Sequence, residues 1–266
     1  QFAGTTPEVF AARRRAAYQA FYEHMPLRPR ALPDANGAVR LYERFSLGEL
    51  ATMHMVDAGQ YRSIQRCARG RSRRGHVAPA SCAELADPAR TMLGREQEAW
   101  LADGLKSPTA QWTLLAQPLM MSPLVETTTA GEPGYFTDGW SAYAPARERL
   151  LQGLAATQNP VVFGGDMHAF VVSDLKGADG SVVASEFVGA AVTSNPAPDR
   201  LLKALPANPQ VRLFDNRVHG YMRAELSAAR MAVALRAVSD RRDPHARIST
   251  LKDYVVENGA RRATEV

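Results

Sequence analysis

The stretch Val161-Val-Phe-Gly-Gly-Asp-Met-His-Ala-Phe170 decides the fold. Its apolar start predicts a buried strand, and the two glycines end that strand just before Asp166 and His168. Open α/β sheets bind ligands beyond the carboxyl ends of their strands, and glycine there lets backbone approach a ligand. Carboxylate and imidazole groups suit metal ions, so we expect both side chains to face a polar cavity and bind metal. The alternative is a turn with a capping Asp and a surface His.

The rest of the chain is predicted to alternate helices and strands at first and to be dominated by strands later. Helices are expected over 7–23, 90–105 and 144–157, and a long loop over 122–143. Strands are expected over 40–45, 50–57, 112–116, 161–165, 171–175, 182–187, 189–193, 211–216, 221–226, 232–238 and 254–257. This order predicts an α/β sandwich with sheets packed face to face. No linker divides it, so residues 1–266 are expected to form one domain.

Length and composition agree with a folded globular chain. The 266 residues are 45% hydrophobic and 22% charged, which excludes a disordered tail, a collagen-like fibre and a disulfide-dense miniprotein. No apolar run approaches about 18 residues, so no membrane span is expected. The net charge of +5 suits an anionic substrate.

The two cysteines, Cys67 and Cys82, lie at either end of an Arg-rich loop. A disulfide closing that loop would contribute about 3 kcal/mol and would indicate an oxidising compartment. The alternative is two free thiols. The arginines of 62–74 could attract phosphate or nucleic acid, or could form a solvated loop; Arg62, directly after Tyr61, is the best candidate for a phosphate contact.

Six motifs, in order along the chain, resemble the PhoD-like alkaline phosphatase family. They are the helix that runs from Arg14 into Pro26, Asp57–Ser63, Asp87–Leu101, Asp138–Tyr143, Gly165–His168 with Ser185–Val188 after it, and His219–Arg223. Each is short, but six in one order are specific together. The sequence departs from the family pattern at Gly59, Ser141 and Ala142, where Arg, Asp and Gly are usual.

The resemblance implies a calcineurin-like metallophosphoesterase fold, a four-layer αββα sandwich. It implies secreted or periplasmic hydrolysis of small phosphate esters, mono- or diesters, with nucleic acid only as a conceivable substrate. Iron and calcium are the metals it implies, with other divalent metals as the alternative. Asp166 and His168 would hold metal, and Arg62 and His219 would lie near the phosphate. For His219 the alternative is a histidine held by hydrogen bonds at the start of a strand.

The family's early metal ligands would precede Gln1. We therefore expect the chain to correspond to the C-terminal half to two-thirds of a family member, incomplete on the N-terminal side of its fold. The alternative is a non-catalytic remnant, or a subunit that needs a separate N-terminal half.

Overall fold

A computed structural model describes residues 6–27, 39–67, 75–106, 110–127 and 131–266. They fall in two compact units, Gln1–Glu43 and Arg44–Val266. In the first unit α1 spans Pro7–His24, close to the predicted 7–23, with Thr6 capping it by accepting from Val9 N at 3.4 Å. The single domain expected over 1–266 stays a prediction.

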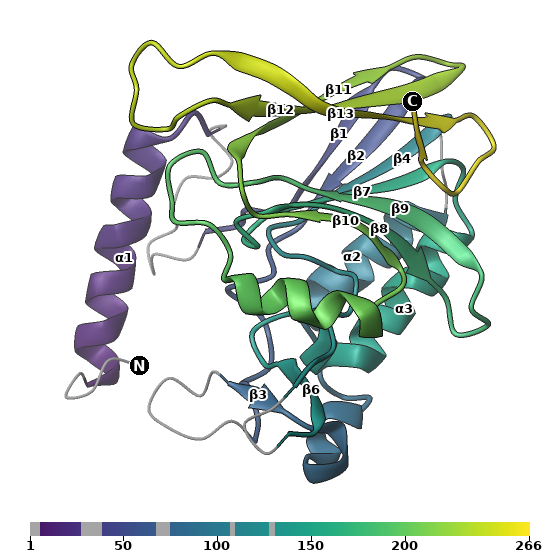
Figure 1. Ribbon diagram of the computed structural model, residues 1–266. Coiled ribbons are helices and arrows are strands. Elements are labelled where there is room, and N and C mark those ends of the chain that lie inside the picture. The colour runs from purple at the N-terminus through teal and green to yellow at the C-terminus, as the bar shows by residue number, and fades with distance from the viewer. Residues whose placement is uncertain (1–5, 28–38, 68–74, 107–109, 128–130) are drawn as a thin grey trace. The chain divides into compact units, whose positions relative to one another are not determined.

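The second unit is built on a seven-stranded sheet with the order β1-β2-β4-β7-β9-β8-β10 (Figure 1). The strands are β1 Glu43–Leu47, β2 Ala51–Met55, β4 Trp112–Ala116, β7 Pro160–Gly164, β8 Phe170–Lys176, β9 Val182–Val188 and β10 Val211–Asp215. The pairs β2–β4, β4–β7 and β7–β9 are parallel, and β8 is antiparallel to both β9 and β10. The sheet is therefore mixed, and β7 lies at its middle.

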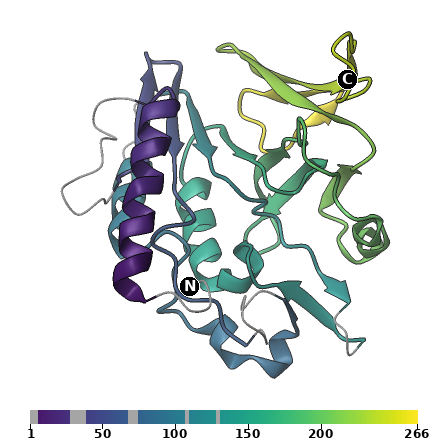
Figure 2. The ribbon, with the colours of Figure 1, turned by 90° about the vertical axis from the view of Figure 1, so that its left-hand side faces the viewer.

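Two helices cover one face of this sheet and a second sheet covers the other (Figures 1 and 2). The helices are α2 Arg95–Lys106 and α3 Ala144–Ala155; the second sheet has the order β11 His219–Leu226, β12 Arg230–Val238, β13 Ile248–Glu257 and β14 Thr264–Glu265. Val162 joins the core on the helix side, whereas its neighbour Val161 joins the core between the sheets. This alternation follows from the period of two along a strand, and it confirms the α/β class with sheets packed face to face.

The segment expected as a long loop, 122–143, contains short elements. β6 Pro133–Phe136 is the middle strand of a small antiparallel sheet, in which it pairs with β5 Glu126–Thr127 on one side and with β3 His76–Val77 on the other. Short 3-10 helices are η2 Pro79–Ser81, η3 Ala83–Ala86, η4 Trp140–Tyr143 and η5 Asp199–Ala207. Of these elements, β5, β6, η4 and η5 supply side chains that line a cavity beside the turn that follows β7.

The start of one predicted helix and the existence of one predicted strand were wrong. α2 begins at Arg95 instead of residue 90, because Gly94 has φ +77° and Arg90 is used elsewhere, donating to the carbonyl oxygen of Ile64 at 2.9 Å. Residues 189–193 form no strand, because the parallel partner strand β7 ends at Gly164. Gly189 N still donates to the Gly164 carbonyl oxygen, and the chain bends at 192–194. Through the described residues, no helix has both the length and the apolarity needed to cross a membrane.

Cys67 and Cys82 form a disulfide, as predicted, with their Cα atoms 5.9 Å apart. These are the chain's two cysteines, so thiol titration of the unfolded, unreduced protein should find no free thiol. Replacing both by Ser should lower the free energy of unfolding by about 3 kcal/mol, since the bridge limits the freedom of the unfolded chain. Two titratable thiols, or a double variant as stable as the parent in denaturant, would contradict the pairing.

His54 is a buried titratable group on β2. It is 1% exposed, its Nδ1 accepts from Arg44 Nε at 3.4 Å, and its ring lies edge-on to that of Trp100. Burial, with a smaller effect of the Arg44 charge, lowers the pKa of His54 to about 4. The folded protein therefore keeps this imidazole neutral where the unfolded chain, with its ordinary pKa of about 6.5, takes up a proton.

The contribution of His54 to stability should be complete above about pH 6.5 and should be lost as pH falls toward 4. Between about pH 7 and pH 5 we expect it to cost on the order of 1–2 kcal/mol of unfolding free energy. His54→Gln keeps an acceptor for Arg44 but does not titrate, so its urea stability should fall less over the same range. Parallel pH dependence in the two proteins would contradict the assignment.

Candidate functional site

The turn after β7 is fixed by a close backbone contact. A Cβ at Gly164 would lie 2.3 Å from the carbonyl oxygen of Leu119, so only glycine fits there. Met167 N then donates to the carbonyl oxygen of Gly165 at 2.8 Å, which tightens the turn. The middle strand of the sheet thus ends directly against the segment after β4.

Asp166 and His168 both adopt left-handed backbone conformations in this turn, with φ of +66° and +54°. This region is uncommon for residues other than glycine, and such strained residues cluster at active sites and ligand clamps. Asp166 is exposed, His168 is half-buried, and both border a cavity. Their place at the end of a central strand is the predicted one; their role as metal ligands stays a prediction.

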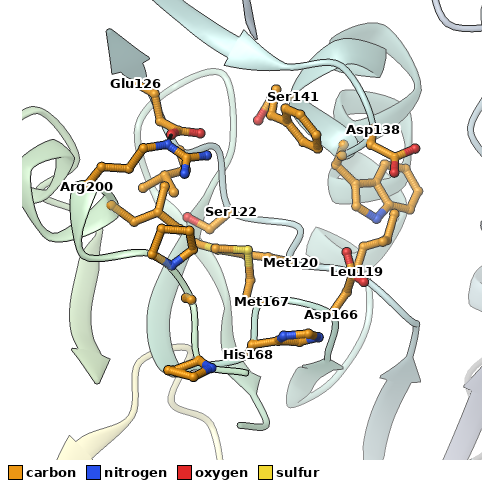
Figure 3. A pocket seen from close by; sticks show the side chains of 18 residues that line it. Leu119, Met120, Ser122, Glu126, Asp138, Ser141, Asp166, Met167, His168 and Arg200 are labelled. Atoms are coloured by element: carbon orange, nitrogen blue, oxygen red, sulfur yellow. Dashed lines mark ion pairs between the residues drawn. The ribbon is translucent and has the colours of Figure 1, made fainter. Parts of the chain in front are cut away.

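The cavity, called here the main pocket, has a volume of about 250 Å³ (Figure 3). Most of its wall is apolar, which differs from the polar cavity expected. It is lined by Leu119, Met120, Ser122, Leu124, Glu126, Phe136, Asp138, Gly139, Trp140, Ser141, Asp166, Met167, His168, Pro196, Ala197, Pro198, Arg200 and Leu201.

A second hollow, called here the loop cavity, lies against the same turn. It has a volume of about 340 Å³ and is lined by 164–166, His168 and the loop 189–194. Asp166 and His168 therefore border both cavities, and a group bound between these two side chains would be reachable from either.

The side chain of His219 contacts the backbone of the loop that lines the loop cavity. Its Nε2 lies 2.8 Å from the carbonyl oxygen of Ser194, and Arg241 donates to the carbonyl oxygens of Thr193 and Ser194. His168 makes a similar contact from the other side, Nδ1 to the carbonyl oxygen of Asn195 at 2.7 Å. His219 lines neither cavity that contains Asp166, so the expected contact of His219 with phosphate stays a prediction.

Arg62 does not line the main pocket, but it contacts Asp138, which does. Its Nη2 pairs with Asp138 Oδ1 at 2.8 Å and its Nη1 donates to the Asp138 carbonyl oxygen at 3.1 Å. Gln65 also donates to Asp138 Oδ1. It is Asp138 that lines the pocket, so Arg62 is oriented onto that carboxylate, and its contact with phosphate stays a prediction.

Sequence reasoning missed the polar residues at the opposite end of the pocket. Glu126 lies 2.8 Å from His76 Nε2 and 3.7 Å from Arg200 Nε. Arg200 belongs to η5, a helix that was not predicted from the sequence. Neither Glu126 nor Arg200 belongs to a recognisable motif, and a contact between residues so far apart in sequence leaves no local signal.

Glu186 on β9 is fully buried, and it holds the backbone of a segment that lines the main pocket. Its two oxygens accept from Met121 N and from Ser122 N, the latter at 2.9 Å, and Ser173 Oγ donates to it at 2.9 Å. Burial raises the pKa of Glu186, while these donors and the charge of Arg147 act in the opposite direction. Glu186 thus pairs within the fold, and it fixes the backbone of 121–122.

Asp166 and His168 supply too few ligands for a complete metal site. In the described part of the chain, one group of three or more His, Cys, Asp or Glu side chains lies within ligating distance, namely Cys67, Cys82 and Glu84, and both cysteines are in the disulfide. A carboxylate and an imidazole are the right donor types, but calcium alone takes about 6–8 oxygen ligands. Asp166 and His168 are therefore suitable types of metal ligand, but two ligands are too few to hold a metal ion alone.

Comparison with known proteins identifies the family. A family model described as PhoD-like phosphatase matches residues 1–235, and the chain belongs to this family. It is 36% identical over 264 residues to alkaline phosphatase D of Bacillus subtilis (strain 168), covering 96% of this chain and 44% of that protein. A solved structure described as the structure of PhoD matches with a TM-score of 0.86 and 34% identity, covering 99% of this chain and 50% of the other. The chain thus spans about half the length of the relatives it matches.

Glu186→Gln should destabilise the protein, because one of the two backbone donors, Met121 N or Ser122 N, would face an amide NH₂ in place of an acceptor. We expect a loss of about 1–3 kcal/mol of unfolding free energy, measured in denaturant. Ser173→Ala removes one hydroxyl donor only and should cost about 1 kcal/mol. Equal stability of Glu186→Gln and the parent would show that this carboxylate does not hold the segment.

Proposed function

We propose that the protein containing this chain hydrolyses phosphate esters with the help of bound metal. The observation that carries the proposal is the turn at Asp166 and His168, where two left-handed residues of ligand type end the central strand beside two cavities. Family membership and the similarity to a protein named alkaline phosphatase D support the reaction class. The substrate would be a small phosphate mono- or diester.

Asp166 and His168 would hold the metal, for which iron and calcium are our expectation. When bound, metal ions at such a site polarise the phosphoryl group and make a water molecule nucleophilic near neutral pH. The chain's own residues would prepare this site. Gly164 and Glu186 fix the backbone on either side, and His219 with Arg241 hold the loop that faces it.

Arg62 would either orient Asp138 toward the phosphate or give up its ion pair with Asp138 and bind the phosphate itself. As the residues lie, the guanidinium orients the Asp138 carboxylate at the pocket wall. Binding of a phosphate nearby would offer Arg62 a second anion, since guanidinium groups bind carboxylate and phosphate with the same geometry.

We further propose that the remaining metal ligands come from polypeptide outside these 266 residues, on the same or another chain. The coverage of 44% of the related alkaline phosphatase and the shortage of ligands in the described residues support this. The same polypeptide would complete a four-layer αββα sandwich. The disulfide supports a secreted or periplasmic location, since such bridges persist in oxidising compartments.

The test is hydrolysis of a chromogenic phosphate ester at alkaline pH with iron and calcium added, using the full polypeptide that contains this chain. Asp166→Asn and His168→Asn should each lower kcat/KM by about 100-fold or more and reduce bound metal, as loss of a metal ligand does. Asp253→Asn and His245→Asn make the same changes at exposed positions of other elements and should leave both unchanged. Full activity and metal content in the first pair would contradict the site.

Residues 1–266 alone should be far less active than the full polypeptide. Turnover of about 10 per second, typical of enzymes, from a preparation shown by intact mass to contain only these residues would contradict a shared metal site. A complete lack of metal and activity even in the full polypeptide would favour the non-catalytic alternative.

A further inference from the structure

The main pocket offers a place for the organic part of the substrate. Asp166 and His168 lie at one end, while Glu126 and Arg200 lie at the other, with Met120 and Met167 between them (Figure 3). If a phosphate ester is cleaved beside Asp166, the alcohol part of the ester must lie in one of the cavities next to this residue. The pocket is the apolar one of the two cavities that reach this position.

The wall of the pocket is chemically suited to an apolar group. Met120, Leu124, Trp140, Met167 and Leu201 line it, and methionine side chains adapt their shape to what they contact. A sugar or another polyhydroxylated alcohol would find fewer hydrogen-bond partners along these apolar side chains than it has in water, which costs affinity. An aryl or alkyl group would instead gain by leaving water.

The size of the pocket also limits the occupant. Its volume of about 250 Å³ exceeds the roughly 150 Å³ in which a protein cavity binds benzene. Glu126 bounds the far end, held by His76 Nε2 at 2.8 Å and paired with the half-exposed Arg200. One ring, or an alkyl chain of similar length, fills the apolar part before it meets this charged boundary.

We propose that the main pocket binds the alcohol part of the substrate, and that the substrates are phosphate esters of aryl or alkyl alcohols. This assignment rests on the proposed function for the position of the phosphate. It names a substrate class for the site and adds no chemical step to the hydrolysis.

Gly139 is a position on the pocket wall where a side chain can be added without disturbing the fold. It lines the pocket, its φ of −97° is ordinary for any residue, and an added Cβ would meet no atom within 4 Å. Gly139→Leu should therefore place a side chain in open space, and Gly139→Ala is the matched small control. Ser141→Leu narrows the same side of the pocket from η4 and serves as a second test if Gly139→Leu fails to fold.

The experiment compares the affinities of benzylphosphonate and methylphosphonate by calorimetry on the full polypeptide loaded with metal. The parent and Gly139→Ala should bind benzylphosphonate about tenfold more tightly, from burial of the ring. In Gly139→Leu or Ser141→Leu this preference should vanish, with methylphosphonate binding unchanged. Equal affinities in the parent, a preference that survives both leucine variants, or no binding of either phosphonate would overturn the assignment.

A parallel assay of benzyl and methyl phosphate hydrolysis separates this inference from the proposed function. Hydrolysis of both esters without selective binding of benzylphosphonate would overturn the pocket assignment and leave the phosphoesterase function standing. Selective binding that the leucine variants abolish, without any hydrolysis, would contradict the proposed function and still assign the pocket to an aryl ligand.

Discussion

The contact between Gly164 and the carbonyl oxygen of Leu119 is the constraint on which the site depends. It places the end of the central strand against the segment 117–122, with no room for any side chain. Buried polar groups then hold that segment from two sides. The Gln117 side chain exchanges hydrogen bonds with the Leu119 backbone and accepts from Trp140 Nε1 at 3.0 Å, and Glu186 accepts from the backbone of 121–122. Such networks specify one arrangement, because each buried donor left without an acceptor is costly.

The parts of the fold that the sequence predicted well are those determined by local pattern. β4 spans Trp112–Ala116 as predicted, because a short apolar run between polar neighbours has few alternatives in a buried sheet. The turn at 179–180 has a local cause too, since Asp-Gly is a typical hairpin dipeptide: Gly180 adopts φ +79° and Asp179 accepts from Ser181. The strand expected over 189–193 failed because its parallel partner β7 ends at Gly164, and the apolar content of 189–193 does not reveal where a neighbouring strand ends.

The same division separates the candidate site residues. Asp166 and His168 could be placed because their strand, glycines and turn are contiguous in sequence. The partner of Arg62 could not be predicted, because Asp138 lies 76 positions away in the sequence. His219 likewise binds the backbone of Ser194, 25 positions earlier, as the hydrogen-bonded alternative for this histidine had allowed. Charge and residue type suggested a role for Arg62 and for His219, but only the folded structure reveals which residues they contact.

The loop that closes one side of the site is held by residues that follow it in the chain. Arg241 lies 48 positions beyond Thr193, and it follows β12 of the second sheet. During synthesis, which proceeds from the N-terminus, the turn at Asp166 leaves the ribosome well before the side chains that secure the facing loop. Assembly of the loop cavity must therefore wait for a late, non-local pairing of the two sheets, and this cavity should form late in folding.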